Sequence, residues 1–304
     1  MGELVSPMSL LHLLAPAKLN LYLRVIGKRA DGYHEIETLF ERIDLADELT
    51  FEPARGALAL TTDDPSLPGD EENLIVKAAR ALQAEAGTNQ GARLRLTKRI
   101  PIAAGLGGGS SDAATTLIGL NQLWGLRLDR ARLAALAAQL GSDVPFFLFE
   151  EAFAVGRGRG EVCEPVAAAA PLAQVLVIPR ERLSTREIYA GAQLGLTAPK
   201  PSITMMQHAL RNGSLGELAE GLWNDLEPEA IRRCPVITVI QTRLRHHGVL
   251  AARVSGSGSS VFGVCTDLTQ AQEVAWRLRV ESPPDWRIEV VQTLLERKTA
   301  LNTV

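Results

Sequence analysis

The first patterned segment of the chain, residues 10–26, alternates apolar and polar positions. Leu19, Leu21 and Leu23 fall on one face of this segment, whereas Asn20 falls on the other. A period of two residues is typical of a β-strand with one buried face. We therefore predict a strand here, a turn at the Asp-Gly pair of residues 31–32, and further strands over residues 35–43 and 49–52.

Helical spacing of the apolar residues takes over further along the chain. Leu74, Ala78 and Leu82 recur every four residues within residues 73–86, and Gly87 follows as a helix stop. The same reasoning predicts helices over residues 112–124, 129–140, 185–193, 202–211, 215–222, 235–247 and 268–278. Strands are predicted over residues 92–97, 146–155, 174–178, 249–254, 261–265 and 286–291, and a solvated loop over residues 61–72.

Strands and helices are mixed along the chain without a strict strand–helix–strand repeat, which indicates an α+β fold. A length of 304 residues accommodates two domains, and an alanine run that ends at Pro171 marks a change between them. We predict a first domain over residues 1–168 and a second over residues 169–304.

A glycine-rich loop leads from the strand predicted over residues 92–97 into the next helix. Four glycines fall between Gly105 and Gly109, and Ser110, Ser111 and Asp112 come directly after them. Glycine lets a backbone approach a ligand closely, and a helix N-terminus presents unpaired N–H groups and the positive end of its dipole. The pattern favours a phosphate-binding loop over a plain turn, with one of the three polar residues as the helix cap.

This loop departs from the common nucleotide-binding motifs. Read from Gly105, a Walker A loop would need Gly-Lys where the chain has Ser110 and Ser111. A dinucleotide fingerprint would need a third glycine at Ser110. The H-R-D and D-F-G companions of a protein-kinase loop do not occur in the sequence. The sequence therefore predicts a phosphate cradle of another type.

Composition and charge narrow the classes of function. A net charge of −3 with scattered Lys and Arg provides no basic surface for nucleic acid. The cysteines, Cys163, Cys234 and Cys265, lie far apart, which argues against a disulfide framework and a thiolate zinc site. The apolar run of residues 10–15 is too short for a membrane span and lacks the basic start of a signal peptide. We expect a cytoplasmic protein that binds neither nucleic acid nor membrane.

Asp143 and Lys18 are the first candidates for chemistry. Asp143 stands between a predicted helix and an apolar strand, where it is either a base for a substrate hydroxyl or a turn residue. Lys18 lies among apolar residues and either reaches solvent or needs an anionic partner. A Lys18–Asp143 pair would satisfy both groups and keep the carboxylate ionised.

Two aromatic residues, Tyr33 and His34, follow the predicted Asp-Gly turn. The phenol ring could stack on a nucleobase and the imidazole could bond to its edge, or both could simply pack on a hairpin. Arg157 and Arg159 lie within the glycine-rich residues 156–160. We interpret this segment as a solvated hairpin tip, with contact to a phosphate as the alternative. The other histidines show no metal-ligand spacing, and no Gly-x-Ser-x-Gly nucleophile elbow occurs.

Four motifs follow one another between residues 14 and 265. They are Pro16-Ala-Lys-Leu-Asn-Leu21 with Arg29-Ala-Asp-Gly-Tyr-His34, the loop Pro101-Ile-Ala-Ala-Gly-Leu-Gly-Gly-Gly-Ser-Ser-Asp-Ala-Ala114, Gly141-Ser-Asp-Val-Pro145, and Arg253-Val-Ser-Gly-Ser-Gly-Ser-Ser260. In order and spacing they resemble the 4-diphosphocytidyl-2-C-methyl-D-erythritol kinases. These enzymes form a family of the GHMP superfamily (galactokinase, homoserine kinase, mevalonate kinase and phosphomevalonate kinase). The glycine loop alone indicates only the superfamily, whereas the first motif narrows the resemblance to this family.

The resemblance implies a two-domain GHMP kinase fold with the active site in the cleft between the domains. The first domain would resemble ribosomal protein S5 domain 2, and the second would be ferredoxin-like. The implied reaction is ATP-dependent phosphorylation of the 2-hydroxyl of 4-diphosphocytidyl-2-C-methyl-D-erythritol in the non-mevalonate isoprenoid pathway. Mg²⁺ would assist, with Ser110 and Ser111 only as candidates for its ligands. The resemblance is compatible with a monomer or a weak homodimer.

The resemblance also implies roles for individual residues. Asp143 would be the general base and Lys18 its electrostatic partner. The cytidine end of the substrate would be held by Asn20, Tyr33, His34 and Tyr189. ATP would bind with its adenine near Asn73 and Lys98 and its phosphates against Pro101, Ile102, Ala103, Ala104, Gly105, Leu106, Gly107, Gly108, Gly109, Ser110 and Ser111.

Two alternatives remain open at this point. A sister kinase of the superfamily would phosphorylate another substrate, which the motif of residues 31–34 argues against. A nucleotide-binding module that has lost catalysis would serve as a sensor or scaffold, which the presence of both Lys18 and Asp143 argues against. An assay of ADP release separates the two.

Overall fold

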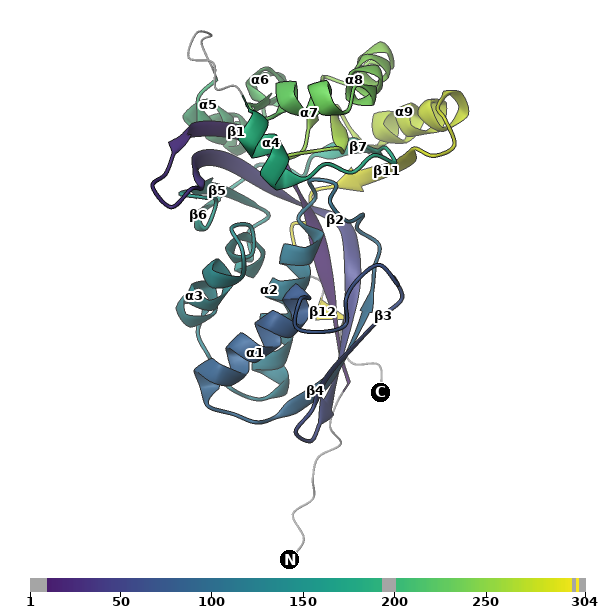
Figure 1. Ribbon diagram of the computed structural model, residues 1–304. Helices are drawn as coiled ribbons and strands as arrows, with labels where there is room; N and C mark the ends of the chain where they lie inside the picture. The colour runs from purple at the N-terminus through teal and green to yellow at the C-terminus, as the bar shows by residue number, and fades with distance from the viewer. Residues whose placement is uncertain (1–9, 193–200, 297–298, 301–304) are drawn as a thin grey trace, which may run out of the picture.

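Two β-sheets organise the computed structural model, which describes residues 10–192, 201–296 and 299–300 (Figure 1). The first sheet has the order β12-β1-β2-β4-β3, with β5 and β6 continuing from β2 and β8 beside β1. Its strands are β1 (Leu11–Lys28), β2 (His34–Ala54), β3 (Leu58–Thr62), β4 (Gly91–Thr97), β5 (Phe153–Arg157), β6 (Val162–Val166), β8 (Trp223–Asn224) and β12 (Thr299–Ala300). The second sheet has the order β11-β7-β10-β9 and consists of β7 (Ala173–Ile178), β9 (Ala251–Val254), β10 (Val261–Cys265) and β11 (Arg287–Gln292).

Helices pack on each sheet and leave the long strands β1 and β2 running between the two halves (Figure 1). The first sheet carries α1 (Leu74–Ala86), α2 (Gly108–Leu123), α3 (Arg130–Leu140) and the short 3-10 helix η1 (Pro145–Leu148). The other half contains α4 (Thr185–Gly191), α5 (Ile203–Asn212), α6 (Leu215–Gly221), α7 (Glu227–Arg233), α8 (Val236–His246) and α9 (Leu268–Glu281). This mixture of helices and largely antiparallel sheets confirms the predicted α+β class.

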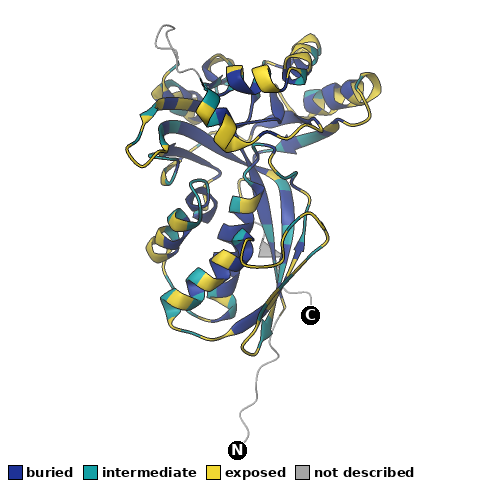
Figure 2. Cartoon of the chain, in the orientation of Figure 1, coloured by how far each residue is buried: buried dark blue, intermediate teal, exposed yellow. Residues whose placement is uncertain are grey.

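Three apolar clusters form the core, and their buried residues face inward between helices and sheets (Figure 2). One lies between the first sheet and α1–α3, and another surrounds the second sheet. A third cluster joins the halves, because Leu19 and Leu39 of the first sheet pack with Leu176 and Phe262 of the second. Burial of apolar area drives this packing, so a continuous apolar core joins the two halves.

The predicted boundary at residues 168/169 falls between β6 and β7. Two strands from beyond that boundary, β8 and β12, pair with β1 of the first sheet. The two proposed domains therefore share a sheet at these points, and the boundary itself stays a prediction. Among the described residues, no helix combines the length and hydrophobicity that crossing a bilayer requires.

Several element predictions are wrong in instructive ways. Residues 35–43 and 49–52 belong to one strand, β2, because it pairs with β1 along nearly its whole length and the buried Asp47 finds partners there. Residues 146–155 form η1 and then β5 rather than one strand. The elements β3, β6, β8, β12 and α7 were not predicted. The helix predicted over residues 185–193 ends at Gly191, because Ala192 has an extended backbone, and residue 193 lies outside the described residues.

The helix after the glycine loop also begins earlier than predicted. α2 starts at Gly108, and its N-cap is Gly107, which has no side chain to offer. The expectation that Ser110, Ser111 or Asp112 caps this helix is therefore wrong. Without a side-chain acceptor, the first N–H groups of α2 remain available to an anion, which suits a phosphate cradle better than the predicted cap would.

Candidate active site

A cavity of about 970 Å³ opens between the two halves of the molecule. It is lined by β1, the glycine loop before α2, the start of α4 and the loop after β9, which lie far apart in the sequence. Every predicted site residue except the buried Ser111 lines this cavity. The fold thus brings together the segments that the sequence analysis singled out separately.

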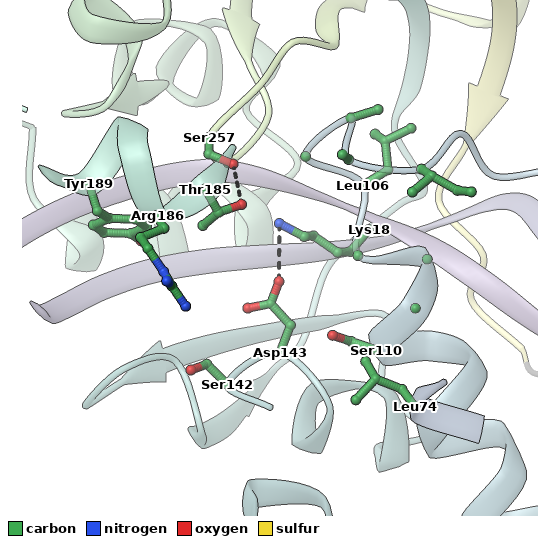
Figure 3. A pocket seen from close by; sticks show the side chains of 18 of the residues that line it. Lys18, Leu74, Leu106, Ser110, Ser142, Asp143, Thr185, Arg186, Tyr189 and Ser257 are labelled. Atoms are coloured by element: carbon green, nitrogen blue, oxygen red, sulfur yellow. Dashed lines mark hydrogen bonds and ion pairs between the residues drawn. The ribbon is translucent and has the colours of Figure 1, made fainter. Parts of the chain in front are cut away.

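Lys18 and Asp143 meet inside this cavity (Figure 3). The Lys18 Nζ lies 3.5 Å from the Asp143 Oδ2, and the two side chains are 4% and 30% exposed. Burial lowers the pKa of Lys18, and the carboxylate of Asp143 offsets this only in part. The two residues that were predicted to pair do lie together, and Asp143 is the more accessible of the two.

Asn20 fixes the direction of the lysine. Its Oδ1 accepts a hydrogen bond from the Lys18 Nζ, while its Nδ2 donates to the Thr38 Oγ1 over 2.8 Å. The Thr38 hydroxyl in turn donates to the backbone oxygen of Tyr22 over 2.6 Å. This chain of bonds determines which end of the Asn20 amide faces the lysine. Both ends of the Asn20 amide thus form hydrogen bonds within the protein, one to Lys18 and one to Thr38. The predicted contact of Asn20 with cytidine stays a prediction.

The glycine loop is wedged between Lys18 and a second glycine turn, residues 255–260. Gly105 has φ 78°, and a Cβ there would lie 2.1 Å from the backbone oxygen of Ser255. Gly107 has φ 69°, and a Cβ there would lie 2.9 Å from the Lys18 Cγ. The Ser255 Oγ also donates to the Gly105 oxygen over 3.0 Å. These two glycines are therefore required by close approach as well as by backbone conformation.

Lys98 occupies a different electrostatic environment in the same cavity. Its Nζ lies 2.5 Å from the Asp47 Oδ2 and 2.8 Å from the Asp112 Oδ2, and its side chain is 6% exposed. Burial opposes its charge, but the two carboxylates outweigh burial and raise the pKa of Lys98. Burial raises the pKa of Asp112, and the neighbouring charge of Asp47 adds to this effect against the attraction of Lys98.

Asp47 also holds the backbone that enters the glycine loop. Its Oδ1 accepts hydrogen bonds from the backbone N–H groups of Arg99 at 2.5 Å and Ile100 at 2.7 Å. The sequence analysis missed Asp47, because nothing in its neighbourhood along the chain distinguishes it from a solvated turn residue. Only the pairing of β2 with β4 brings it to Lys98.

The aromatic residues lie at another part of the cavity. The His34 and Tyr189 rings stack with centroids 5.2 Å apart and 29° between their planes. Burial, with a smaller contribution from Lys28, lowers the pKa of His34, which favours the neutral imidazole. Tyr33 is 54% exposed and lies under the guanidinium of Arg159, 4.8 Å from its ring centroid. The interpretation of the β5–β6 turn as merely solvated is therefore wrong for Arg159, which lines the cavity.

Asn73 has a structural role in addition to its place in the cavity. Its Oδ1 accepts the backbone N–H of Ile75 over 2.9 Å and caps α1, and its Nδ2 donates to the Pro68 oxygen over 2.8 Å. The side chain nevertheless lines the cavity. Its predicted place near adenine stays a prediction.

Sequence reasoning also missed the start of α4 and its contact with the second glycine turn. The hydroxyls of Thr185 and Ser257 lie 2.9 Å apart and join these segments (Figure 3). Arg186, the next residue, points into the cavity beside Tyr189 (Figure 3). No motif marks these residues, because their position depends on how the two sheets pack together.

The chain matches two family descriptions, "GHMP kinases N terminal domain" over residues 73–151 and "GHMP kinases C terminal" over residues 206–280. A crystal structure of a 4-(cytidine 5'-diphospho)-2C-methyl-D-erythritol kinase superposes with a TM-score of 0.78 at 38% identity, covering 92% of this chain and 98% of that one. A homoserine kinase from Cytophaga hutchinsonii superposes with a TM-score of 0.76 at 18% identity, covering 98% and 99%. The second likeness is one of fold alone.

Similarity in sequence identifies the family more specifically than similarity in fold does. The 4-diphosphocytidyl-2-C-methyl-D-erythritol kinase of Pelotomaculum thermopropionicum is 45% identical over 267 residues, which cover 88% of this chain and 93% of that protein. The enzyme of the same name from Ralstonia nicotianae is 44% identical over 274 residues, 90% of each. With this identity over nearly the whole length, and with Lys18, Asp143 and the glycine loop around one cavity, the chain belongs to the family of 4-diphosphocytidyl-2-C-methyl-D-erythritol kinases.

Proposed function

We propose that this kinase transfers the γ-phosphoryl group of ATP to the 2-hydroxyl of 4-diphosphocytidyl-2-C-methyl-D-erythritol, giving the 2-phosphate and ADP. The observation that carries the proposal is the convergence of Asp143, Lys18 and the glycine loop in one cavity. Phosphoryl transfer requires little covalent participation by the protein, so positioning and charge stabilisation dominate. A carboxylate, an ammonium group and a row of backbone N–H groups supply both.

Asp143 is proposed as the general base. Its carboxylate is partly exposed, while its partner Lys18 is almost completely buried. A base of this kind accepts the proton of the substrate hydroxyl as the new P–O bond forms. Lys18 orients the carboxylate, because its buried ammonium group requires this counter-charge.

The glycine loop and the first turn of α2 are proposed to bind the phosphates of ATP. The absence of a side-chain cap at Gly107 leaves the first N–H groups of the helix to an anionic ligand. Asn73 and Lys98 line the same cavity, which supports a place for adenine and ribose beside them. The dipole of α2 adds a favourable interaction of roughly 1 kcal/mol with an anion at this end.

Mg²⁺ is proposed as the cofactor, and the residues around the loop fit it. Within the described part of the chain, the Ser111 Oγ and the Asp112 Oδ1 are buried oxygen atoms without a hydrogen-bond partner. Mg²⁺ prefers oxygen ligands and binds through one or two protein groups together with phosphates. Ser110 and Ser111 therefore remain candidates, and Asp112 joins them. When bound, the ion would offset negative charge on the transferred group.

The cytidyl end is proposed to bind at His34, Tyr189 and Tyr33. Stacked aromatic rings and a neutral imidazole can hold a pyrimidine by its face and its edge. Asn20 could reach the same ligand from the side of Lys18. A location in the cytoplasm and a monomeric or weakly dimeric state are likewise proposed and await measurement.

The test is ADP production with purified enzyme, ATP and Mg²⁺, with and without the cytidyl substrate. We expect ADP release to depend on this substrate, and mevalonate and homoserine to be inert. Turnover with either of those alcohols instead would favour a sister kinase. No ADP with any of them, together with retained ATP binding, would indicate a nucleotide-binding module without catalysis.

A further inference from the structure

The cavity holds more cations than the proposed chemistry uses. Lys18 pairs with Asp143, Lys98 lies between two carboxylates, and Arg159 lies 3.5 Å from the Glu161 carboxylate. Among the described residues, two lining cations form no ion pair, namely Lys28 and Arg186. An unpaired cation that faces a cavity is available to an anionic ligand.

Arg186 lies on the same helix face as the aromatic residue Tyr189. The two residues are three positions apart on α4, so their side chains are neighbours on the helix surface. Figure 3 shows the guanidinium extending past the Tyr189 ring toward the side of the cavity that holds Ser142 and Asp143. The hydrogen bond between Thr185 and Ser257 anchors the start of this helix against the second glycine turn.

The local sequence gives no reason for a cation at this position. Arg186 lies in the first turn of α4, where the helix dipole disfavours positive charge. The acidic residue of that turn, Glu187, pairs with Arg233 rather than with Arg186. A residue that departs from local preference without a partner to compensate is a candidate for a functional role.

We infer that Arg186 binds the diphosphate of the cytidyl substrate and thereby makes the enzyme select a nucleoside diphosphate over an uncharged nucleoside. The inference rests on the proposed function. If the base stacks at His34 and Tyr189 and the reacting hydroxyl lies at Asp143, the diphosphate must span the space between them. Arg186 is the cation that reaches this space, whereas Lys28 lies at the end of β1 beside His34.

The chemistry of the two partners fits. A guanidinium presents a planar set of N–H donors that matches two phosphate oxygens at once, which an ammonium group cannot do. A cation here also offsets the repulsion between the diphosphate and the nearby carboxylate of Asp143. Arg186 is thus expected to act on substrate binding and selectivity rather than on the proton transfer itself.

The experiment is equilibrium binding of cytidine, CMP and CDP by calorimetry, without ATP, so that no turnover occurs. The variants are Arg186→Ala, Arg186→Lys, Lys28→Ala and the control Arg180→Ala, which removes an exposed arginine of the preceding segment that does not line the cavity. We expect Arg186→Ala to weaken CDP binding about tenfold and cytidine binding less than twofold, because a charged hydrogen bond is lost. Arg186→Lys should lie between, and Arg180→Ala should bind like the wild type.

The possible outcomes separate this inference from the proposed function. A wild-type enzyme that binds neither cytidine nor CDP contradicts the proposed function. A wild-type enzyme that binds both with equal affinity, or an Arg186→Ala variant that keeps the full preference for CDP, overturns the inference alone. Loss of the preference in Lys28→Ala but not in Arg186→Ala also overturns it, because it assigns the diphosphate to the other cation.

Discussion

Lys18 and Lys98 line the same cavity and are almost equally buried, yet their surroundings shift their pKa values in opposite directions. Lys18 has one partly exposed carboxylate at 3.5 Å, and burial lowers its pKa. Burial acts on Lys98 as well, but two buried carboxylates at 2.5 and 2.8 Å raise its pKa. The number and distance of the acids, rather than the depth of the lysine, decide the outcome.

The different surroundings of Lys18 and Lys98 indicate which of the two charges is available to a ligand. Lys98 is paired inside the protein with two carboxylates, and Asp47 links it to the backbone that enters the glycine loop. The charge of Lys18 is incompletely balanced, so a phosphoryl group that arrives beside it gains attraction. Lys98 stabilises the entry to the glycine loop through Asp47, whereas Lys18 is expected to interact with a phosphoryl group that binds there.

The largest expected effect comes from removing the acid of the Lys18 site. Asp143→Ala should lower kcat about 10²–10⁴-fold, the range that general base catalysis supplies. ATP affinity should change less than about twofold, because the proposed phosphate cradle is left intact. Steady-state kinetics and ATP titration measure the two. The exposed Asp285, outside the cavity, provides the control Asp285→Ala, and wild-type turnover in Asp143→Ala would remove Asp143 from the mechanism.

The two lysines should differ most clearly in stability. Lys98→Met leaves Asp47 and Asp112 buried together without a cation, and we expect a loss of about 3–5 kcal/mol in the free energy of unfolding. Lys18→Met leaves an acid that solvent reaches, so we expect a smaller loss of about 1–3 kcal/mol, which comes from the buried Asn20 Oδ1 that loses its donor, together with lower turnover. Urea denaturation of both variants measures the difference. Equal losses would show that the two environments are not distinct.

Glu41 is a buried acid whose partners in the described part of the chain are hydrogen-bond donors rather than a lysine, so it extends the comparison between the surroundings of Lys18 and Lys98. Glu41 accepts hydrogen bonds from Gln174 and Thr293, which link β2 to the second sheet and its end, and burial raises its pKa to about 7 from an ordinary value of 4.5. Between pH 4.5 and about pH 7, Glu41 keeps its proton in the folded state but has released it in the unfolded state. The free energy of unfolding should therefore fall as pH rises through this window, by at most about 3 kcal/mol.

Urea denaturation at pH 5 and pH 8 tests this for the wild type and for Glu41→Gln. The variant carries no titratable group at this position, so its stability should change less across the window. An unchanged pH dependence in Glu41→Gln would assign the effect to other groups.

The smallest expected effect lies at the aromatic end of the cavity. Tyr33→Ala removes an exposed ring that lies against Arg159, and His34→Ala removes one that stacks on Tyr189. Each should raise KM for the cytidyl substrate about tenfold, the value of roughly one aromatic contact, with little change in kcat. The KM for ATP serves as the internal control. An unchanged KM for the cytidyl substrate would count against a cytosine-binding role.

The local pattern of apolar and polar residues predicted most helices and strands, but it did not predict where two segments form one continuous strand. The helix predicted over residues 129–140 was confirmed as α3, which Asp129 caps, because capping and apolar spacing are local properties. The single long strand β2 was not predicted, because Asp44 and Asp47 interrupt its apolar pattern. The buried Asp47 is stabilised there by its ion pair with Lys98 and by two backbone N–H groups that follow β4.

The sequence by itself predicted a phosphate cradle and the family, because each depends on residue types at short spacing, and it supplied Lys18 and Asp143 as candidates, which the fold then brought together. The tertiary structure decided which charges remain free. Arg186, Arg159 and Asp47 carry no motif, and their neighbours come from segments far away in the chain. Electrostatic roles depend on distance and burial, and these are properties of the packed molecule rather than of its order of residues.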